Sequence, residues 1–434
     1  MGCDLAAIVV GLLGGFVVGL GVSATWGAWS SPGGLATMFG TLTALLGAYL
    51  CLVLLVLVAR VPWLEQEVGQ DRLVRWHRKV APWALLLILA HFVLTSVGYA
   101  QASSVSVGQE VVDLVMGYPW MVPAAAGMAL MIFLALTSIA WLRHKIAYET
   151  WWAAHTYFYL AVVLAFGHQL TAGTLFTSHD LLRYFWITLY AVVAAAIVWG
   201  RIGLPLIRSF RHDLRVERVV QEAPGVVSVY ISGRNLALLG AQGGQFFGWR
   251  FMTRHWWWQA HPYSLSAGAN GSWLRITVKD LGDQSGSLMR LTPGTRVIAE
   301  GPYGAFTARA RATGRIAAFA AGVGITPIRA ILDDLPPGVK VTLIYRVADV
   351  EADNVTLRGE IEEIIERRGW RLEYLTGSRM DHPFSVDYLT RIVPDLEASD
   401  VYVCGPPGFA DAVCAAARTA GVPPRRLHHE AFSF

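Results

Sequence analysis

The sequence predicts a multi-domain membrane protein, in which a six-helix transmembrane bundle precedes an antiparallel β-barrel and an α/β domain with a parallel sheet. Two observations support this fold class. Most charged residues of the 434-residue chain lie after residue 200, whereas the first part contains long apolar runs. The later part changes first to short alternating segments and then, from about residue 314, to strands that alternate with helices. We expect domains at residues 1–209, 210–312 and 313–434.

Six apolar runs have the length of a transmembrane helix, since about 20 residues cross about 30 Å of hydrocarbon. They cover roughly residues 5–25, 36–59, 80–99, 121–142, 152–172 and 184–204. The first run could also be a signal peptide, but it lacks a basic n-region. Gly11, Gly15 and Gly19 form a ridge of small residues in this run, which predicts a helix-packing face.

The loop charges predict the orientation, because Lys and Arg accumulate in cytoplasmic loops. The basic connections cover residues 60–79, 143–145 and 201–211, and the connections poor in Lys and Arg cover 26–35, 100–119 and 173–183. We therefore expect a cell-membrane protein whose termini and later domains are cytoplasmic. The net charge of the chain is +4, and its Lys and Arg residues form no cluster that would indicate a nucleic-acid partner. The four cysteines form no CxxC motif and indicate no disulfide framework.

Four histidines lie in apolar stretches as two pairs, His77 with His91 and His155 with His168. Along a helix the members of these pairs are about 21 Å and about 20 Å apart. Two adjacent helices would thus offer two histidines at each of two depths, an arrangement that predicts two stacked bis-imidazole haems and electron transfer across a bilayer. The alternative is that each histidine is merely a satisfied polar residue. Ionisable groups within the bilayer are costly and usually functional, which favours ligation.

The angular positions of these histidines differ between the two pairs. On an ideal helix His77 and His91 lie within about 40° of each other, whereas His155 and His168 are about 140° apart. The sequence predicts either a local distortion near Gly167 or two haems held at different angles.

The later part of the chain predicts two sheets. Residues 214–310 contain short alternating segments between Gly, Pro and Asn turns, which indicates the barrel. Its clearest strands are Val226–Ile231, Leu274–Val278 and Arg296–Glu300. From residue 314 the predicted strands are Arg315–Ala320, Val341–Arg346, Arg371–Leu375 and Val401–Cys404, with helices at Leu357–Arg368 and from Phe409.

A glycine-rich turn follows the first strand of the parallel sheet. Gly322-Val323-Gly324-Ile325-Thr326-Pro327 opens a helix, so its backbone can approach a pyrophosphate near the helix N-terminus. Glycines after strands also form ordinary turns. Cys404-Gly405-Pro406, at the end of a later strand, adds weight because ligands of such sheets bind beyond the carboxyl ends of strands.

The segment His261-Pro262-Tyr263-Ser264-Leu265-Ser266 combines aromatic faces with hydroxyl donors. Such groups can stack on and hydrogen-bond a flat heteroaromatic ring. An ordinary strand entered through a proline is an equally good interpretation of the hexapeptide alone.

Taken in this order, the motifs resemble the ferric reductase and NADPH oxidase family over nearly the whole chain. His261 to Ser264 is similar to the flavin motif of the family, and Gly282-Asp283-Gln284-Ser285 is similar to its flavin-phosphate segment. Gly322 to Pro327 is similar to its nicotinamide-nucleotide loop. Cys404 to Pro406 is similar to the turn beside the nicotinamide, and Glu430 to Phe434 is similar to the terminal stretch, whose last aromatic covers the flavin.

The resemblance implies a ferric reductase-like transmembrane domain with two b-type haems, an FAD-binding barrel and an NADPH-binding α/β domain. His77 and His155 would bind the inner haem, and His91 and His168 the outer one. Catalytic roles are implied for Cys404 and Phe434. The implied cofactor-binding residues are His261, Pro262, Tyr263, Ser264, Ser266, Ser285, Gly286, Ser287, Gly322, Gly324, Thr326, Pro327, Arg346, Cys404, Gly405, Pro406 and Phe434.

The resemblance further implies that electrons pass from cytoplasmic NADPH through FAD and the haems to an outside acceptor, either a ferric complex or oxygen that becomes superoxide. Thr95 stands where some eukaryotic oxidases carry a second polar histidine, so the acceptor stays open. Arg346, which ends a strand, favours NADPH over NADH, although the acids Asp349 and Glu351 lie nearby. No EF-hand loop or SH3-binding proline run indicates a regulatory subunit.

Two other functions fit parts of the sequence. One is a membrane-anchored flavin reductase with a cytoplasmic acceptor, which the four histidines disfavour. The other is a transporter or channel regulated by nucleotide, a class that favours broken helices or charged residues at mid-span. The predicted spans contain histidines but no Asp, Glu or Lys at mid-span.

Overall fold

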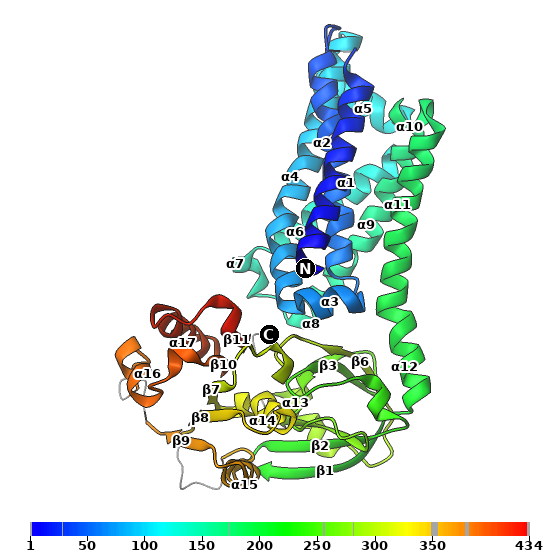
Figure 1. Ribbon diagram of the computed structural model, residues 1–434. Helices are drawn as coiled ribbons and strands as arrows, with labels where there is room; N and C mark the ends of the chain where they lie inside the picture. The colour runs from blue at the N-terminus through cyan, green and yellow to red at the C-terminus, as the bar shows by residue number, and fades with distance from the viewer. Residues whose placement is uncertain are drawn as a thin grey trace. The chain divides into compact units, whose positions relative to one another are not determined.

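The computed structural model describes residues 2–27, 29–172, 174–254, 257–280, 282–348, 355–377 and 382–431. The chain divides into two compact units, Met1–Arg201 and Ile202–Phe434. The first consists of helices and is called the helical unit; the second contains all the strands and is called the sheet unit (Figure 1).

Apolar helices make up the helical unit. They are α1 (Gly2–Thr25), α2 (Gly34–Leu57), α3 (Pro62–Val68), α4 (Gln70–Ser103), α5 (Val107–Gly117), α6 (Met121–Thr137), α7 (Ala140–Arg143), α8 (Tyr148–Thr156), α9 (Phe158–Thr171), α10 (Thr174–Ser178) and α11 (Asp180–Val198). Among the described residues, the helical stretches long and apolar enough to cross a membrane are Ala7–Thr25, Gly34–Leu57, Arg72–Ser103 and Asp180–His212. Helices α5 and α6 pass this test only together, with a bend of 114° between them. The helices thus support a membrane domain with several spans, and the count of six stays a prediction.

The fifth predicted span, 152–172, is divided into two helices. Helix α8 ends at Thr156 and α9 begins at Phe158, so His155 and His168 belong to different helices. The angle of an ideal continuous helix therefore does not apply to this pair. The predicted distortion at Gly167 is wrong, since α9 continues through this residue. Gly167 instead makes room for Trp120, whose ring would lie 2.5 Å from a Cβ added there.

Glycines of α2 allow α4 to approach its backbone. A Cβ added at Gly40 would lie 2.6 Å from the Thr95 hydroxyl oxygen, and one added at Gly33 would lie 1.9 Å from the Gly98 carbonyl oxygen. Close helix approach through small residues is a common way to pack helices in membranes.

The glycine ridge predicted in α1 behaves differently. Within the described part of the chain, a Cβ added at Gly11, Gly15 or Gly19 would meet nothing within 4 Å. The predicted packing face is therefore wrong. In α1 the glycines that face a neighbour are Gly14, against Tyr49, and Gly21, against Leu42.

The sheet unit begins with helix α12 (Leu204–His212) and two antiparallel sheets of three strands each. The strands are β1 (Arg215–Ala223), β2 (Val226–Ser232), β3 (Phe246–Phe251), β4 (His261–Ser264), β5 (Trp273–Lys279) and β6 (Val297–Tyr303). Their orders are β1-β2-β5 and β4-β3-β6, and isolated bridges at Leu265 with Ile276 and at Arg215 with Arg296 link the two sheets. Apolar side chains of both sheets share one core.

The rest of the sheet unit alternates strands and helices. These are β7 (Arg315–Ala321), α14 (Ile325–Asp334), β8 (Lys340–Arg346), α15 (Arg358–Arg368), β9 (Arg371–Leu375), α16 (Val386–Ile392), β10 (Asp400–Gly405), α17 (Pro407–Thr419) and β11 (Leu427–Ala431). The strand order is β11-β10-β7-β8-β9, and every pair is parallel, which confirms the predicted parallel sheet.

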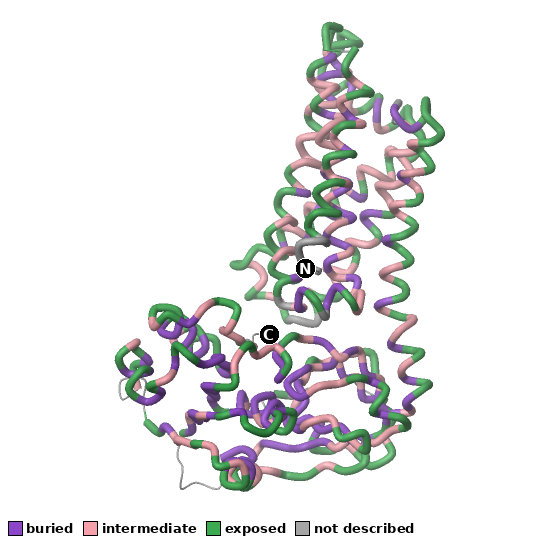
Figure 2. Tube along the Cα trace, in the orientation of Figure 1, coloured by how far each residue is buried: buried purple, intermediate pink, exposed green. Residues whose placement is uncertain are grey.

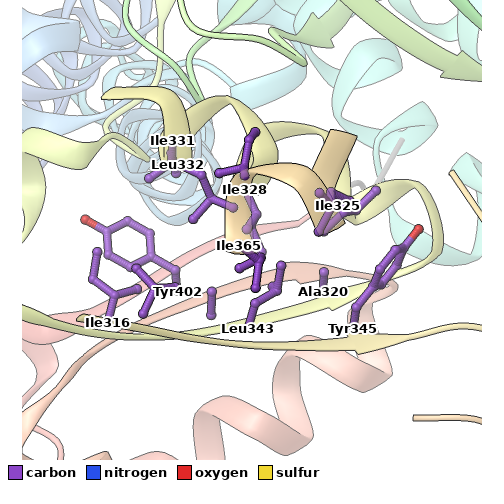
Figure 3. Close-up of a cluster of buried hydrophobic side chains, with 14 of the residues drawn as sticks. Ile316, Ala320, Ile325, Ile328, Ile331, Leu332, Leu343, Tyr345, Ile365 and Tyr402 are labelled. Atoms are coloured by element: carbon purple, nitrogen blue, oxygen red, sulfur yellow. The ribbon is translucent and has the colours of Figure 1, made fainter. Parts of the chain in front are cut away.

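Helices cover both faces of this sheet, so its central strands are apolar throughout. Successive residues of β7 pack into different cores: Ile316 and Ala320 face α14 and α15, whereas Phe319 faces α16 and α17. Figure 3 shows Ile325, Ile328 and Ile331 of α14 above the first of these faces, and the strands of the sheet are largely buried (Figure 2).

A buried ion network joins the antiparallel and parallel halves of the sheet unit. Arg275 of β5 is 1% exposed, and its guanidinium donates to both carboxylate oxygens of Glu360 on α15, at 2.5 and 2.9 Å. Glu360 also accepts a hydrogen bond from Arg329 of α14 at 2.7 Å. Burial alone would raise the pKa of Glu360, but the hydrogen bonds and charges of Arg275 and Arg329 outweigh it and lower that pKa below its ordinary value of 4.5.

Replacing Glu360 tests the contribution of this network. We expect Glu360→Gln to lower the free energy of unfolding of the sheet unit by about 3 kcal/mol, because Arg275 is left as an uncompensated buried charge. Glu363→Gln is the matched control on the same helix: its pair with Arg367 is exposed, at 3.6 Å, and should contribute less than about 0.5 kcal/mol. Denaturant unfolding followed by circular dichroism measures both.

The lowered pKa of Glu360 predicts that the free energy of unfolding depends on pH. A carboxyl whose pKa is lowered on folding stabilises the fold above its unfolded pKa, and this stabilisation is lost as the pH falls through the folded pKa. Between pH 6 and the acid range below 4.5, the wild type should therefore lose more stability than Glu360→Gln. Parallel stability curves for the two proteins would contradict the assigned role.

Candidate functional site

Two of the four histidines hydrogen-bond backbone carbonyls across a helix interface. His77 Nδ1 lies 3.2 Å from the Leu54 carbonyl oxygen, and His91 Nδ1 lies 2.9 Å from the Gly40 carbonyl oxygen. An imidazole whose Nδ1–H donates to a carbonyl leaves its Nε2 lone pair for a metal, as most metal-binding histidines do. Both acceptors belong to α2, so the close packing of α2 on α4 orients both rings.

His77 and His155, which were predicted to share the inner haem, lie side by side. The ring centroids of His77 and His155 are 6.2 Å apart with an angle of 70° between the planes. Two imidazoles that bind one metal from opposite sides have centres about 6 Å apart, since each metal–nitrogen bond is about 2 Å. His91 and His168 are close enough to interact electrostatically.

The histidine pairs fit a metal cofactor in which the cofactor itself supplies most of the metal ligands. Among the described residues, no three His, Cys, Asp or Glu side chains gather where they could hold a metal ion. A haem needs only two protein ligands, because the porphyrin supplies the other four. His155 is further held by stacking on Trp151, at 4.9 Å between centroids, and its Nδ1 lies 3.4 Å from the Ser138 hydroxyl.

In the sheet unit, the predicted flavin segment forms β4 and the residues after it. His261 and Tyr263 are alternate residues of the strand, and their ring centroids are 6.3 Å apart. Pro262, between them, is exposed and pairs in register with Gly248. The strand is held by the Trp249 indole, which donates to the Tyr263 carbonyl oxygen at 2.9 Å.

Ser266 lies away from the other predicted flavin residues. It is fully buried, and its hydroxyl accepts hydrogen bonds from Arg275 Nε at 3.0 Å and from the Thr277 hydroxyl at 2.7 Å. Its contacts are those of the ion network that joins the two halves of the sheet unit. The predicted role of Ser266 in cofactor binding stays a prediction.

The predicted flavin-phosphate residues Ser285, Gly286 and Ser287 lie in the short helix α13 (Asp283–Ser287). The Ser285 hydroxyl donates to the Gly282 carbonyl at 3.1 Å, and a Cβ added at Gly286 would lie 3.0 Å from the Asp280 carboxylate. A phosphate here would face that carboxylate, which disfavours it electrostatically. This assignment depends on the resemblance alone.

The predicted nucleotide loop lies between β7 and α14. Gly322 has φ 55°, in the left-handed region that favours glycine. A Cβ added at Gly324 would lie 2.4 Å from the Cys404 carbonyl oxygen, so only glycine allows the loop to pack against the end of β10. Thr326 and Pro327 are buried in the first turn of α14, and the Thr326 hydroxyl donates to the Val323 carbonyl at 3.0 Å.

Parallel pairing brings the other predicted nucleotide residues to the same sheet edge. Gly405 ends β10, and Pro406 follows it. Arg346 ends β8, on the other side of β7, in register with Ala321. The guanidinium of Arg346 donates to the Gly377 carbonyl at 3.4 Å. This edge, beyond the carboxyl ends of the strands, is where open α/β sheets bind ligands.

Glu430 is a site residue that sequence reasoning missed. The Ser264 hydroxyl donates to its carboxylate at 3.0 Å, although the two residues are 166 positions apart. Glu430 is also the register partner of Cys404 in the neighbouring strand. The sequence contained the signal, a carboxylate at the start of the terminal stretch, but no local pattern indicated that β11 pairs with β10.

The thiol of Cys404 is fully buried at this meeting point. Burial, and secondarily the charge of Glu430, raises its pKa well above the ordinary value of 9.0. Phe434, Asp349 and Glu351 lie outside the described residues, so the roles predicted from them stay predictions.

Comparison with known proteins connects both units to redox proteins. Residues 43–166, which include His77, His91 and His155, match the family described as ferric reductase like transmembrane component. A flavohemoprotein of Vibrio cholerae serotype O1 is 30% identical over 227 residues, which is 50% of this chain and 57% of that protein. NADH-cytochrome b5 reductase 2 of Chaetomium globosum is 31% identical over 146 residues, or 30% of this chain and 41% of that protein.

These matches together reproduce the predicted combination of domains. The chain is thus similar to a ferric reductase like transmembrane component over residues 43–166 and to a flavohemoprotein over about half of its length. The flavohaem-like FAD/NAD binding domain of nitric oxide dioxygenase from Vibrio cholerae O1 biovar El Tor is 25% identical, with 51% of this chain and 98% of that domain covered and a TM-score of 0.43.

The chain spans about half the length of the curated relatives it matches. The matches support a flavoprotein oxidoreductase with FAD- and NAD(P)H-binding regions and a transmembrane domain.

Alkylation tests how closed the meeting point of Ser264, Glu430 and Cys404 is. At pH 8, iodoacetamide should leave Cys404 unmodified in the folded protein, because the thiolate is the reactive form and both burial and the raised pKa suppress it. Glu430→Gln should leave it protected, since burial is the larger cause. Mass spectrometry of peptides from folded and unfolded samples measures this, and labelling of folded Cys404 within minutes would contradict it.

Proposed function

We propose that this chain passes electrons from cytoplasmic NADPH through FAD and two bis-histidine b-type haems to an acceptor outside the cell. The observation that carries the proposal is the pairing of His77 with His155 at 6.2 Å, with the His77 ring backed by a carbonyl of α2. The predicted nucleotide loop of the same chain would bind NADPH, which is the proposed source of the electrons.

The proposed division of labour follows the domain limits expected from the sequence, with haems at residues 1–209, FAD at 210–312 and NADPH at 313–434. When bound, FAD would accept the hydride of NADPH, and the haems would carry single electrons. The protein residues bind and orient these groups.

In the membrane domain, His77 and His155 would hold the inner haem, and His91 and His168 the outer one. The Leu54 and Gly40 carbonyls fix the orientation of the α4 rings and keep the Nδ1 protons in place. Trp151 and Ser138 hold His155 on the other side. Second-shell contacts of this kind typically change metal affinity by about 10- to 100-fold.

In the reductase domain, His261 and Tyr263 would flank the flavin ring, and the Ser264 hydroxyl would accept a hydrogen bond from an N–H group of the flavin. Glu430 fixes the Ser264 hydroxyl in the described structure. Pro262 restricts the strand between them. Cys404, Gly405 and Pro406 would position the nicotinamide, and Phe434 would cover the flavin face until nicotinamide replaces it.

Gly322, Gly324, Thr326 and Pro327 would form the pyrophosphate loop. We propose NADPH rather than NADH because Arg346, at the end of the adjacent strand, can pair with a 2′-phosphate. The acceptor is proposed as a ferric complex or oxygen. Orientation in the cell membrane, with both termini in the cytoplasm, is proposed from the loop charges.

Anaerobic reduction of the purified full chain tests the whole proposal. NADPH should reduce FAD and then haem, and separate additions of ferric chelate and of oxygen should identify the acceptor by the rate of haem reoxidation. Absence of haem absorbance would indicate the membrane-anchored flavin reductase instead, and ion flux without haem would indicate the transporter.

Replacing ligands of the outer pair tests the haem assignment. We expect His91→Ala or His168→Ala to reduce haem content from two per FAD to about one, because each haem needs both axial ligands. FAD reduction by NADPH should stay largely intact. His179→Ala, an exposed histidine at the start of α11, is the control and should keep full haem content. Pyridine haemochrome and flavin absorbance measure the ratio, and a His91 variant with unchanged haem content would refute the assignment.

Removal of Phe434 tests its proposed competition with nicotinamide. An offset aromatic contact contributes about 0.5–1.5 kcal/mol. Truncation after Ser433 should therefore tighten apparent NADPH binding by about two- to tenfold and weaken discrimination against NADH. Nucleotide titrations of FAD-loaded protein give both quantities. Unchanged affinity and selectivity would mean that Phe434 packs elsewhere.

A further inference from the structure

The last candidate span continues into the sheet unit without a loop. The helical stretch Asp180–His212 contains 33 residues, which is about 50 Å of helix. The hydrocarbon core is only about 30 Å thick. The final turns, which form α12, therefore extend beyond the hydrocarbon at the level of the lipid headgroups or just past them.

Helix α12 has a buried face and an exposed apolar face. Pro205, Ser209 and His212 are buried, and α12 packs beside β6. Leu206, Ile207 and Phe210 are 44%, 48% and 73% exposed. Exposed residues recur along α11 and α12 (Figure 2). An apolar face on the direct continuation of a span is a face that lipid can cover.

A second exposed apolar segment lies between β3 and β4. Residues 252–260 read Met-Thr-Arg-His-Trp-Trp-Trp-Gln-Ala. Of the described side chains, Met252 is 40% exposed, Trp257 is 56% exposed and Trp258 is 44% exposed. Tryptophan is enriched where membranes meet water, because its large ring is apolar while its N–H can hydrogen-bond.

Backbone contacts place this segment at the end of the sheet where α12 is attached. The Met252 amide donates to the Arg296 carbonyl at 2.9 Å, and the Arg296 guanidinium lies 5.5 Å from the ring centroid of Phe210. The next residue, Val297, donates to the Leu214 carbonyl at 2.8 Å, two residues after α12 ends. The exposed residues Leu206, Ile207, Phe210, Arg211, Met252, Arg254, Trp257 and Trp258 together are called the α12 edge.

We infer that the α12 edge binds the headgroup layer of an anionic bilayer, with Trp257 and Trp258 in the interface and Arg211 and Arg254 facing lipid phosphates. Its composition, aromatic and basic with no Asp or Glu, is that of interfacial membrane segments. Helix α12 belongs to the same helical stretch, Asp180–His212, as the last candidate span. The inference is independent of which cofactors the protein binds.

Depth-dependent quenching in the full-length protein tests the inference. The protein carries Cys3→Ser and one new cysteine labelled with the fluorophore NBD, since Cys51, Cys404 and Cys414 are buried. The test site is Trp257→Cys, and Phe210→Cys is a second site on the same edge. Glu363→Cys, on the exposed face of α15, is the control. Nanodiscs contain phosphatidylcholine and phosphatidylglycerol, with or without headgroup-nitroxide lipid.

We expect nitroxide lipid to quench the labels at 257 and 210 at least threefold more than the label at 363, with emission at shorter wavelength. Replacing phosphatidylglycerol by phosphatidylcholine should reduce quenching at 257. Quenching equal to that of the control would overturn the inference, because the edge would then face water. Short-wavelength emission without quenching would also overturn it, because the edge would then be covered by protein. An unchanged far-ultraviolet circular dichroism spectrum shows that each variant is folded.

Discussion

The helical unit depends on the absence of a side chain at Gly40. This absence lets α4 approach α2 so closely that His91 Nδ1 lies 2.9 Å from the Gly40 carbonyl oxygen, and the same interface brings His77 to the Leu54 carbonyl. A carbonyl inside a helix already accepts one backbone bond but retains a second lone pair. The packing of two apolar helices thereby orients two polar rings, and the Thr95 hydroxyl, 3.0 Å from His91 Nδ1, is a second partner of one of them.

In the sheet unit, the candidate site residues come from distant parts of the chain. Ser264, Cys404 and Glu430 meet through the pairing of β10 with β11 and one hydrogen bond from β4. Arg275 and Glu360 hold the antiparallel and parallel halves together nearby. A rigid connection of this kind suits a site in which one half would hold the flavin and the other the nucleotide.

Periodic features of the sequence predicted the fold well. The parallel sheet was confirmed because β7, β8 and β10 are largely apolar segments that alternate with recognisable helices, and Arg371–Leu375 was placed with its observed bounds. The pairing of His77 with His155 agrees with the 6.2 Å between their rings. These signals are local or depend only on spacing along one element.

Features that depend on contacts between elements were missed or misplaced. The glycines spaced by four in α1 looked like a packing face, whereas Gly40 of α2 and Gly33, just before α2, contact the neighbouring helix. A ridge of small residues does not reveal which neighbour reaches it. Ser266 looked like part of a flavin motif, but its hydroxyl is committed to Arg275, a residue of another strand. The position of Glu430 beside Cys404 and Ser264 could be predicted only with knowledge of the strand order in the parallel sheet.

The helix break at Tyr157 places His155 and His168 on two separate helices, α8 and α9. Were α8 and α9 a single straight helix, turning His155 by any angle would turn His168 by the same angle, and improving one ring position would worsen the other. With a joint between them, each ring has its own supporting helix. Sequence changes within Tyr148–Thr156 can therefore adjust the position of His155 while that of His168 stays constant, which would let the two proposed haem sites diverge in evolution.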